Sequence, residues 1–578
     1  MTVIADTKVQ TVKVSIDGRA VEVPAGTTVL EAAKQVGIEI PTLCYLKGIQ
    51  AIGACRVCLV EVEGWRGLQA SCVFPVEDGM KIHTNTKQVR DARRFAVELI
   101  LADHPFECLT CSRNLNCELQ SLAMKLGIDH VPYDVDPHPA KADHSNPSIV
   151  RDNAKCILCQ RCVTVCQKVQ GVGALGFCER GFNTQVAPAF QDGLGEVACT
   201  MCGQCSLACP VGAITEKNDI PTVWAAINDP PTHVVVQTAP AVRVALGEEF
   251  GLAPGTAVTG KMVAALRRIG FDKVFDTDFT ADLTIMEEGT ELLNRLQQGG
   301  TLPMITSCSP GWIKYIEHFY PEYLDHLSTC KSPQQMFGAV AKSYYAEKAG
   351  IKPEDMFVVS IMPCTAKKYE RQREEMIQDV DAVLTTRELA KMIKQSGLDF
   401  ISLPDEDYDL PFGIASGAGL IFGATGGVME AALRTVYEIV TKKELPKLDF
   451  HEVRGLEGIK EAVVDLDGTK VKVAIAHGLS NAKKLMEKIK SGEADHQFIE
   501  VMCCPGGCLG GGGQPIPTND EIRRKRMEAI YQEDQNLPIR KSHENPAIQQ
   551  LYKEYLGEPN GEKSHHLLHT HYTKRTRY

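Results

Sequence analysis

Cysteine spacing is the feature that most limits what this chain can fold into. The chain has 22 cysteines in 578 residues, and most of them fall into groups within the first 220 residues. A cytoplasmic chain keeps its thiols reduced, so closely spaced cysteines are more often metal ligands than disulfides. The start, "MTVIADTKVQ", has no basic stretch followed by an apolar core, and no apolar run reaches the roughly 18 residues of a membrane span. We therefore expect a cytoplasmic protein with metal sites and no membrane insertion.

The run C-x2-C-x2-C-x3-C occurs twice, at residues 156–166 and 199–209. It is typical of bacterial-type ferredoxins with two 4Fe–4S clusters, in which the fourth cysteine of each run binds the other cluster. One expected ligand set is Cys156, Cys159, Cys162 and Cys209. The other is Cys199, Cys202, Cys205 and Cys166. Cys178 lies between the runs without a partner, and we expect it to be a packed thiol.

Two further groups of candidate ligands precede these runs. The first, with the spacing C-x10-C-x2-C-x13-C, comprises Cys44, Cys55, Cys58 and Cys72. A sheet-forming segment precedes it, which favours a 2Fe–2S cluster over zinc. The second, with the spacing H-x3-C-x2-C-x5-C, comprises His104, Cys108, Cys111 and Cys117. One imidazole and three thiolates can hold either zinc or a 4Fe–4S cluster, and the spacing alone does not choose between them.

Local patterns predict a multidomain chain of α+β and α/β parts. Residues 11–23 alternate apolar and polar around Asp17-Gly18, which predicts a β-hairpin, and Thr28 with Glu31 predicts the start of a short helix. An amphipathic helix is expected over 87–103. The predicted divisions are a 2Fe–2S domain at 1–84, a His/Cys cluster domain at 85–130, a linker at 131–148, a double 4Fe–4S domain at 149–220 and an α/β domain at 228–578.

Charge and cluster order indicate the kind of chemistry. The net charge of -11 gives no support for nucleic-acid binding, which usually needs a basic face. Several iron–sulfur clusters in series form a route for single electrons. We therefore expect the remaining residues to carry a redox reaction.

Three motifs in the C-terminal part carry a family resemblance. They read "TSCSPGW" at 306–312, "MPCTAKKYE" at 362–370 and "EVMCCPGGCLGGGG" at 500–513. Together with the cysteine groups, they make the whole chain resemble the iron-only (FeFe) hydrogenases, in particular the catalytic subunits of multimeric NAD(P)-linked or electron-bifurcating enzymes. The first 220 residues also resemble the large iron–sulfur subunit of respiratory complex I. In both families the histidine-containing group binds a 4Fe–4S cluster, so the resemblance implies one at His104.

The resemblance implies a β-grasp 2Fe–2S domain, a ferredoxin-like double-cluster domain and an α/β domain that holds the H-cluster. The H-cluster is a 4Fe–4S cubane joined through a thiolate to a two-iron unit with CO, cyanide and azadithiolate ligands. By match, Cys364 and Cys504 hold the cubane and Cys508 bridges to the two-iron unit. Lys367 matches a lysine that hydrogen-bonds a cyanide. The residues that match the family's proton path are Glu288, Glu291 and Ser328.

One position departs from the family pattern. The family has two adjacent cysteines in the first motif, of which the first carries protons and the second ligates the cubane. Here the second is Ser309, so Cys308 is left for one of the two roles, and we expect it to ligate the cubane. Cys330 and Cys503 are unusual, and each is either a compensating ligand or a packed residue.

The expected function is reversible H2 oxidation and proton reduction, with electrons leaving through one 2Fe–2S and three accessory 4Fe–4S clusters. No nucleotide-binding signature is apparent, so a flavin- and NAD(P)-binding partner subunit, a small 2Fe–2S subunit and ferredoxin are the expected partners. The alternatives are a stand-alone ferredoxin-linked hydrogenase and an H2 sensor. Glycine-rich runs at 416–419 and 506–513 are expected to bring backbone amides close to the diatomic ligands.

Overall fold

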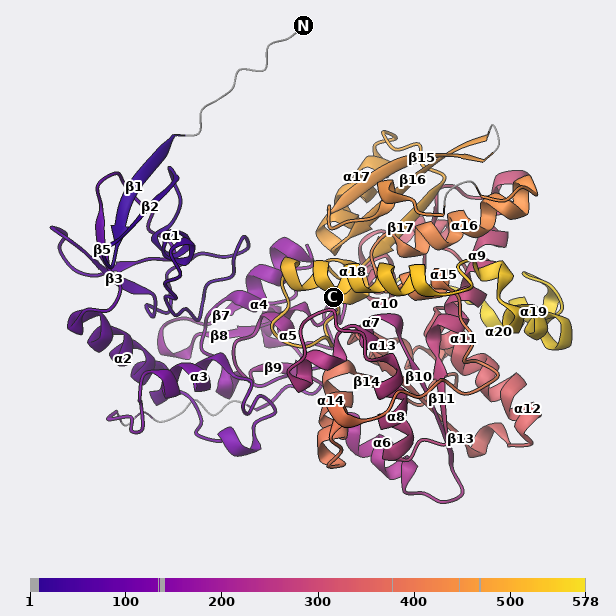
Figure 1. The fold of residues 1–578 in the computed structure, drawn as a ribbon, viewed down its shortest axis with the longest axis horizontal. Coiled ribbons are helices and arrows are strands. Elements are labelled where there is room, and N and C mark those ends of the chain that lie inside the picture. Colours follow the sequence, from indigo (N-terminus) through magenta and orange to yellow (C-terminus); the bar gives the residue numbers. More distant parts are fainter. Residues whose placement is uncertain are drawn as a thin grey trace, which may run out of the picture.

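The computed structural model describes residues 10–133, 135, 141–376, 378–445, 448–466 and 469–576. The cluster-rich N-terminal part forms a lobe beside a larger body built from the rest of the chain (Figure 1). The beginning of the predicted first domain, 1–9, and residues 134 and 136–140 of the predicted linker lie outside the described residues.

The first unit is a five-stranded sheet with the order β2-β1-β5-β3-β4. Its hairpin turns at Asp17 and Gly18, whose φ angles of 47° and 80° suit a type I′ turn, so the predicted hairpin is confirmed. The predicted helix is confirmed too, because the Thr28 hydroxyl accepts a hydrogen bond from the Glu31 N–H at 3.3 Å. The elements are β1 (Thr11–Ile16), β2 (Arg19–Pro24), α1 (Val29–Gln35), β3 (Leu59–Val62), β4 (Gln69–Ala70) and β5 (Lys81–His83).

The middle of the chain is built from short elements around the cysteine runs. Strands β6 and β9 pair antiparallel, which ties the start of the double-cluster segment to its end. A short helix follows the first turn of each run, and a small hairpin, β7–β8, lies between the runs. The elements are α2 (Lys87–Ala102), α3 (Glu118–Lys125), β6 (Ile149–Arg151), α4 (Arg161–Thr164), β7 (Gly176–Cys178), β8 (Gln185–Ala187), α5 (Gln204–Ala208) and β9 (Ile214–Glu216).

The C-terminal body contains two four-stranded sheets. One has the order β11-β10-β13-β14 and is wholly parallel. The other has the order β12-β17-β16-β15, in which β15 alone is antiparallel to its neighbour. The strands are β10 (His233–Thr238), β11 (Lys273–Asp276), β12 (Met304–Ile305), β13 (Met356–Met362), β14 (Ala382–Thr385), β15 (Ile459–Leu466), β16 (Thr469–His477) and β17 (Phe498–Met502).

Helices cover both sheets of this body, so the predicted α/β character is confirmed (Figure 1). The helices up to residue 349 are α6 (Ile220–Ile227), α7 (Pro240–Arg243), α8 (Thr259–Ile269), α9 (Thr277–Gln298), α10 (Pro310–Phe319), α11 (Pro333–Val340) and α12 (Ala346–Ala349). The later ones are α13 (Ala366–Glu370), α14 (Thr386–Gln395), α15 (Gly417–Ile421), α16 (Gly427–Thr441), α17 (Leu479–Lys490), α18 (Asp520–Asn536), α19 (Pro546–Leu551) and α20 (Glu562–Leu568).

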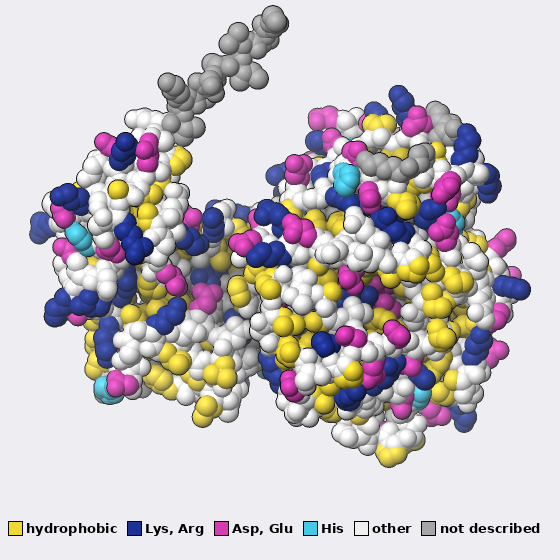
Figure 2. Space-filling model, viewed as in Figure 1, with side chains coloured by type: hydrophobic (Ala, Val, Ile, Leu, Met, Phe, Trp, Pro, Cys, Tyr) yellow, Lys and Arg dark blue, Asp and Glu magenta, His cyan; other side chains and the backbone are white. Residues whose placement is uncertain are grey.

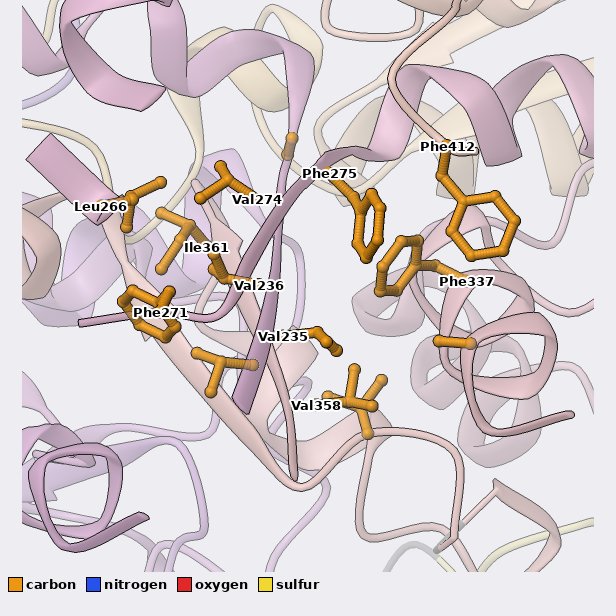
Figure 3. Packing of buried hydrophobic residues seen from close by; sticks show 14 of the residues in the cluster. Val235, Val236, Leu266, Phe271, Val274, Phe275, Phe337, Val358, Ile361 and Phe412 are labelled. Carbon is orange, nitrogen blue, oxygen red and sulfur yellow. The ribbon is translucent and has the colours of Figure 1, made fainter. Parts of the chain in front are cut away.

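The parallel sheet is buried on both faces. Val235, Val236 and Val358 from its strands are fully buried, and aromatic side chains such as Phe275 and Phe337 pack beside them (Figure 3). Such strands read as continuous apolar runs because neither face meets water. Helix α6 belongs to the same core, so the core of this body starts at Ile220, before the predicted boundary at 228. In the described part of the chain, no helix combines the length and apolar character needed to cross a membrane.

Candidate active site and cluster-binding residues

The three C-terminal motifs meet because each begins where a strand ends. Strands β12, β13 and β17 finish at residues 305, 362 and 502, and the motif cysteines Cys308, Cys364 and Cys503 follow within three residues. In α/β sheets, ligands bind beyond the carboxyl ends of parallel strands. The loops line a common cavity. Its lining includes the motif side chains Cys308, Ser309, Cys364, Lys367, Cys503, Cys504 and Cys508.

Lys367 is held at the edge of this cavity. Its Nζ donates to the Cys308 carbonyl at 3.1 Å and to the Glu370 carboxylate at 2.9 Å. The same Glu370 oxygen accepts from Ser332 Oγ at 3.0 Å and Gln334 Nε2 at 3.1 Å. These contacts fix the ammonium group against the first motif. Glu370 stood in the quoted motif, but its role as the anchor of the lysine was not predicted.

The predicted proton-path residues lie together behind the cavity. Ser328 Oγ donates to Glu291 Oε2 at 2.9 Å, and Arg295 binds the other oxygen of Glu291 at 2.6 Å. Arg295 was missed, although its place four residues after Glu291 on α9 is a recognisable pairing signal. Glu288 is 1% exposed, and the Ser328 hydroxyl and the Ser307 amide face it. Its carboxylate oxygens have no close hydrogen-bond partner among the described residues.

Burial sets the protonation of this path. Loss of solvation, reinforced by the charge of Glu291, raises the pKa of Glu288 to about 8. Burial raises the pKa of the Cys308 thiol well above its usual range, and the Glu288 charge raises it further. At neutral pH both groups therefore hold a proton. This is the state from which a buried acid can donate.

Cys330 lies on the proton-path side of the site. Its thiol is 3.9 Å from Glu291 Oε2, and its N–H donates to Ser328 Oγ at 3.3 Å. It is fully buried and is absent from the residues that line the cavity. Cys178, another cysteine without an assigned ligand role, donates to the Pro188 carbonyl at 3.3 Å.

The double-cluster segment forms two separate cysteine-lined cavities. The first has a volume of about 380 Å³, and its cysteines are Cys156, Cys159, Cys162 and Cys209. The second has a volume of about 360 Å³, and its cysteines are Cys166, Cys199, Cys202 and Cys205. These are the two crossed sets that the repeat predicted. The fourth cysteine of each run reaches the other cavity because strands β6 and β9 bring the ends of the segment together.

The contacts differ between the two N-terminal ligand groups, the one that starts at Cys44 and the one that starts at His104. In the first, the Cys44 thiol is in hydrogen-bonding contact with those of Cys55 and Cys72, and Cys72 also contacts Cys58. In the second, His104 Nδ1 lies 3.0 Å from the Pro105 carbonyl. Its Nε2 is buried with no hydrogen-bond partner among the described residues. A carbonyl that holds one ring nitrogen leaves the other free to bind a metal.

Direct contacts join the cysteine groups to one another. Gln50 Nε2 donates to the Cys44 carbonyl at 2.7 Å and to the Cys159 carbonyl at 2.9 Å, which links the first cysteine group to the double-cluster segment. Gly212 packs against the Cys111 thiol. At the other end, Thr365 Oγ1 donates to the Met201 carbonyl at 2.8 Å. No sequence pattern points to Gln50, because its two partners, Cys44 and Cys159, are far apart along the chain.

The glycines of the run 506–513 let its backbone approach the backbone of neighbouring loops. A Cβ at Gly511 would collide with the Pro363 carbonyl, and one at Gly512 with the Cys202 carbonyl. At the first run, Gly419 faces the Asp278 carbonyl in the same way. At these positions the close approach is to other parts of the chain, namely the loops that carry Pro363 and Cys202 and the first turn of α9. The loops of the double-cluster segment and of the motif cavity pack together as a result.

Comparison with known proteins identifies the family. The model "Iron only hydrogenase large subunit, C-terminal domain" matches residues 232–512, and "Iron hydrogenase small subunit" matches 520–575. The NADP-reducing hydrogenase subunit HndD of Solidesulfovibrio fructosivorans is 53% identical over 98% of this chain and 99% of its own. The chain belongs to the iron-only hydrogenase family. Like its relatives it is a hydrogenase, with the N-terminal iron–sulfur domains of the multimeric NAD(P)-linked type.

Other matches cover the whole chain or its separate parts. Iron hydrogenase 1 of Clostridium pasteurianum is 42% identical over 97% of this chain and 99% of its own. A solved structure of apo [FeFe]-hydrogenase HydA1 from Chlamydomonas reinhardtii covers 62% of this chain and 100% of its own, at 48% identity and a TM-score of 0.56. The N-terminal part matches a 2Fe–2S binding domain at 9–87, the NADH-ubiquinone oxidoreductase-G iron–sulfur region at 93–132 and a ferredoxin-like domain of NADH-quinone oxidoreductase subunit 3 at 146–215.

Proposed function

We propose that this chain is the H2-converting subunit of a multimeric NADP-linked hydrogenase, and that it holds an H-cluster, three accessory 4Fe–4S clusters and one 2Fe–2S cluster. The observation that carries this proposal is the cysteine-lined cavity at the three C-terminal motifs, with two further cysteine-lined cavities in the double-cluster segment beside it. When bound, the H-cluster supplies the low-valent iron at which the H–H bond is made or broken. The protein binds that group, moves protons to it and conducts electrons away.

The donor sets fit these groups. Thiolates are the ligands that iron–sulfur clusters require, and the cysteine groups of the N-terminal part offer matching sets for the accessory clusters. We assign Cys364 and Cys504 to the cubane and Cys508 to the bridge, and Lys367 to the cyanide side of the two-iron unit. The free Nε2 of His104 suits the fourth ligand position beside Cys108, Cys111 and Cys117. We assign the first domain to the β-grasp class and the double-cluster segment to the ferredoxin-like class.

Protons follow the path Glu291, Ser328, Glu288 and Cys308. The hydrogen bond between Ser328 and Glu291 and the raised pKa of Glu288 support this order. Arg295 closes the outer end, where its guanidinium holds Glu291. Each member passes a proton to its neighbour, and the cavity end delivers it to the H2 site. We place the enzyme in the cytoplasm, because so many free thiols persist in a reducing compartment.

The experiment that tests this function is infrared spectroscopy of the purified chain under anaerobic conditions, combined with H2-dependent dye reduction. Bands of iron-bound CO and cyanide together with turnover are expected. Turnover without those bands would contradict the H-cluster. The bands without turnover would favour the sensor alternative.

The His104 site gives a separate prediction. Replacement of His104 by alanine removes the imidazole ligand, so we expect one cluster signal to disappear from the electron paramagnetic resonance (EPR) spectrum of the reduced chain. His104→Cys supplies a thiolate instead and should keep a cluster with an altered spectrum. Unchanged spectra for His104→Ala would show that this histidine is not a ligand.

The N-terminal lobe carries a surface suited to a partner subunit. Hydrophobic side chains are exposed on it (Figure 2). Those around the His104 site, from 47% to 92% exposed, are Phe95, Leu99, Phe106, Leu109, Leu115 and Met124. Exposed apolar side chains gathered in one region mark interaction sites. We assign this face to the flavin- and NAD(P)-binding subunit, with the small 2Fe–2S subunit and ferredoxin as further partners.

Introducing charged residues on this surface tests electron transfer to the partner subunit separately from H2 conversion. In the assembled complex, the double variant Leu109→Glu with Leu115→Glu is expected to lower H2-dependent NADP reduction strongly. The two new carboxylates would be buried at the interface without partners, which would weaken binding of the partner subunit. Dye reduction by the same preparation should stay at the wild-type rate. Matched control substitutions at Val463, an exposed apolar residue of the C-terminal body, should leave both activities intact. Unimpaired NADP reduction in the double variant would exclude this docking face.

A further inference from the structure

The cubane site is one matched thiol short. Cys364, Cys504 and Cys508 match family ligands, but Ser309 stands where the family has the remaining cysteine. A serine oxygen is a harder donor than a thiolate and suits iron–sulfur clusters less well. Two other cysteines line the cavity, Cys308 and Cys503. The surroundings of Cys308 and Cys503 indicate which of them is the cubane ligand and which is the proton carrier.

Cys308 faces the proton path. Among the ionisable groups around its thiol, the path residue Glu288 has the largest electrostatic influence, followed by Lys367. Its carbonyl also holds Lys367 at 3.1 Å. A thiolate bound to iron loses its exchangeable proton. Ligation by Cys308 would therefore interrupt the relay at its last member.

Cys503 stands beside the position that lost its cysteine. Its backbone N–H donates to Ser309 Oγ at 3.1 Å, so the two residues are direct neighbours across the cavity wall. Its thiol lies close to that of Cys504, and Cys504 lies close to Cys364; all three line the same cavity. Three thiols thus follow one another along the wall. Cys503 is 3% exposed, and its backbone follows the end of β17, which fixes its position.

The surroundings of Cys503 leave room for its sulfur. Gly311 lies in the first turn of α10, and a Cβ there would come within 2.6 Å of Cys503 Sγ. The Cys503 thiol also contacts that of Cys202, which lines the second cavity of the double-cluster segment. A cubane held by Cys503 would therefore have a ligand in contact with a ligand of the nearest accessory cluster.

We propose that Cys503 provides the missing thiolate of the cubane, so that Cys308 remains free to carry protons. In forming the Fe–S bond the thiol gives up its proton, as metal binding to cysteine requires. The assignment rests on the proposed H-cluster and replaces the ligation by Cys308 that the sequence led us to expect. The contact between Cys503 and Cys202 then becomes the entry point for electrons between the two clusters.

The test uses the full chain produced without the two-iron unit, so that the cubane is seen by itself. We expect Cys503→Ala to lose the cubane EPR signal, or to convert it to a three-iron form on mild oxidation, while the accessory-cluster signals persist. Iron per chain should fall accordingly. The double variant Ser309→Cys with Cys503→Ala restores the family arrangement and should recover the four-iron signal. Cys178→Ala and Cys330→Ala are matched controls that should retain it.

Three results would overturn the proposal. The first is an intact four-iron cubane in Cys503→Ala. The second is loss of the cubane in Cys308→Ala or Ser309→Ala, which would make that residue the ligand. The third is a double variant that still lacks the cubane. Infrared bands of CO and cyanide in the fully assembled wild-type chain test the H-cluster itself, so failure of the ligand assignment can be told apart from failure of the proposed function.

Discussion

Replacing Glu288 by glutamine is expected to reduce H2 production by roughly 10²–10⁴-fold, the usual contribution of a positioned acid–base group. Glutamine keeps the size of the side chain but cannot release and regain a proton. Glu288 has no close hydrogen-bond partner among the described residues, so the substitution breaks no strong contact. We therefore expect the clusters to assemble normally, with infrared and EPR spectra like those of the wild type.

The pH dependence of H2 production and of stability should also reflect the titration of Glu288. Because burial raises the pKa of Glu288 to about 8, the group is protonated below that pH and ionised above it. H2 production, which needs the acid, should fall as the pH rises through about 8. The folded-state pKa lies above the ordinary 4.5, so the chain also loses stability as the pH rises between these values. Glu288→Gln should remove this dependence from both activity and thermal unfolding.

A neighbouring residue provides the control. Glu287 is equally buried on α9, but it binds Tyr552 and His569 and not the path residues. Glu287→Gln is expected to retain turnover while lowering the thermal midpoint, because it loses part of that pairing. Normal H2 production by Glu288→Gln, or an equal loss in Glu287→Gln, would contradict a proton-carrying role specific to Glu288.

Replacing Cys508 by serine is expected to abolish turnover. We assign its thiolate to the bridge between the cubane and the two-iron unit, and a serine hydroxyl at this position is a poor substitute for soft, low-valent iron. The infrared bands of CO and cyanide should vanish with the activity. The accessory clusters have their own cysteines, so their EPR signals should persist.

Cys178→Ser is the matched control for this substitution. Cys178 is a partly buried thiol that donates to the Pro188 carbonyl and belongs to neither cavity of the double-cluster segment. It should keep the bands, the signals and the activity. Retention of the CO and cyanide bands in Cys508→Ser would exclude the bridging role.

Local sequence patterns predicted several secondary-structure elements and cysteine groups of this protein. The hairpin at Asp17-Gly18, the helix that starts after Thr28 and the helix after residue 86 all appear as predicted, because turn and capping preferences act over a few residues. The repeated C-x2-C-x2-C-x3-C runs even predicted which cysteines share a cavity. Such repeats are informative because a cluster demands a fixed number of thiolates at fixed separations.

The roles that we assign to the cysteines near Ser309, cubane ligand or proton carrier, rest on distances between residues that no local sequence pattern contains. Cys330 and Cys503 looked equivalent as unusual cysteines, yet one lies beside Glu291 and the other on the cavity wall. Likewise, the bridge through Gln50 joins residues 109 positions apart. The amino-acid sequence by itself determined the family and the chemistry, and it predicted which cysteines of the double-cluster segment line the same cavity. Only the tertiary structure decided which thiol can meet which partner, because strand ends that are distant along the chain converge at one cavity.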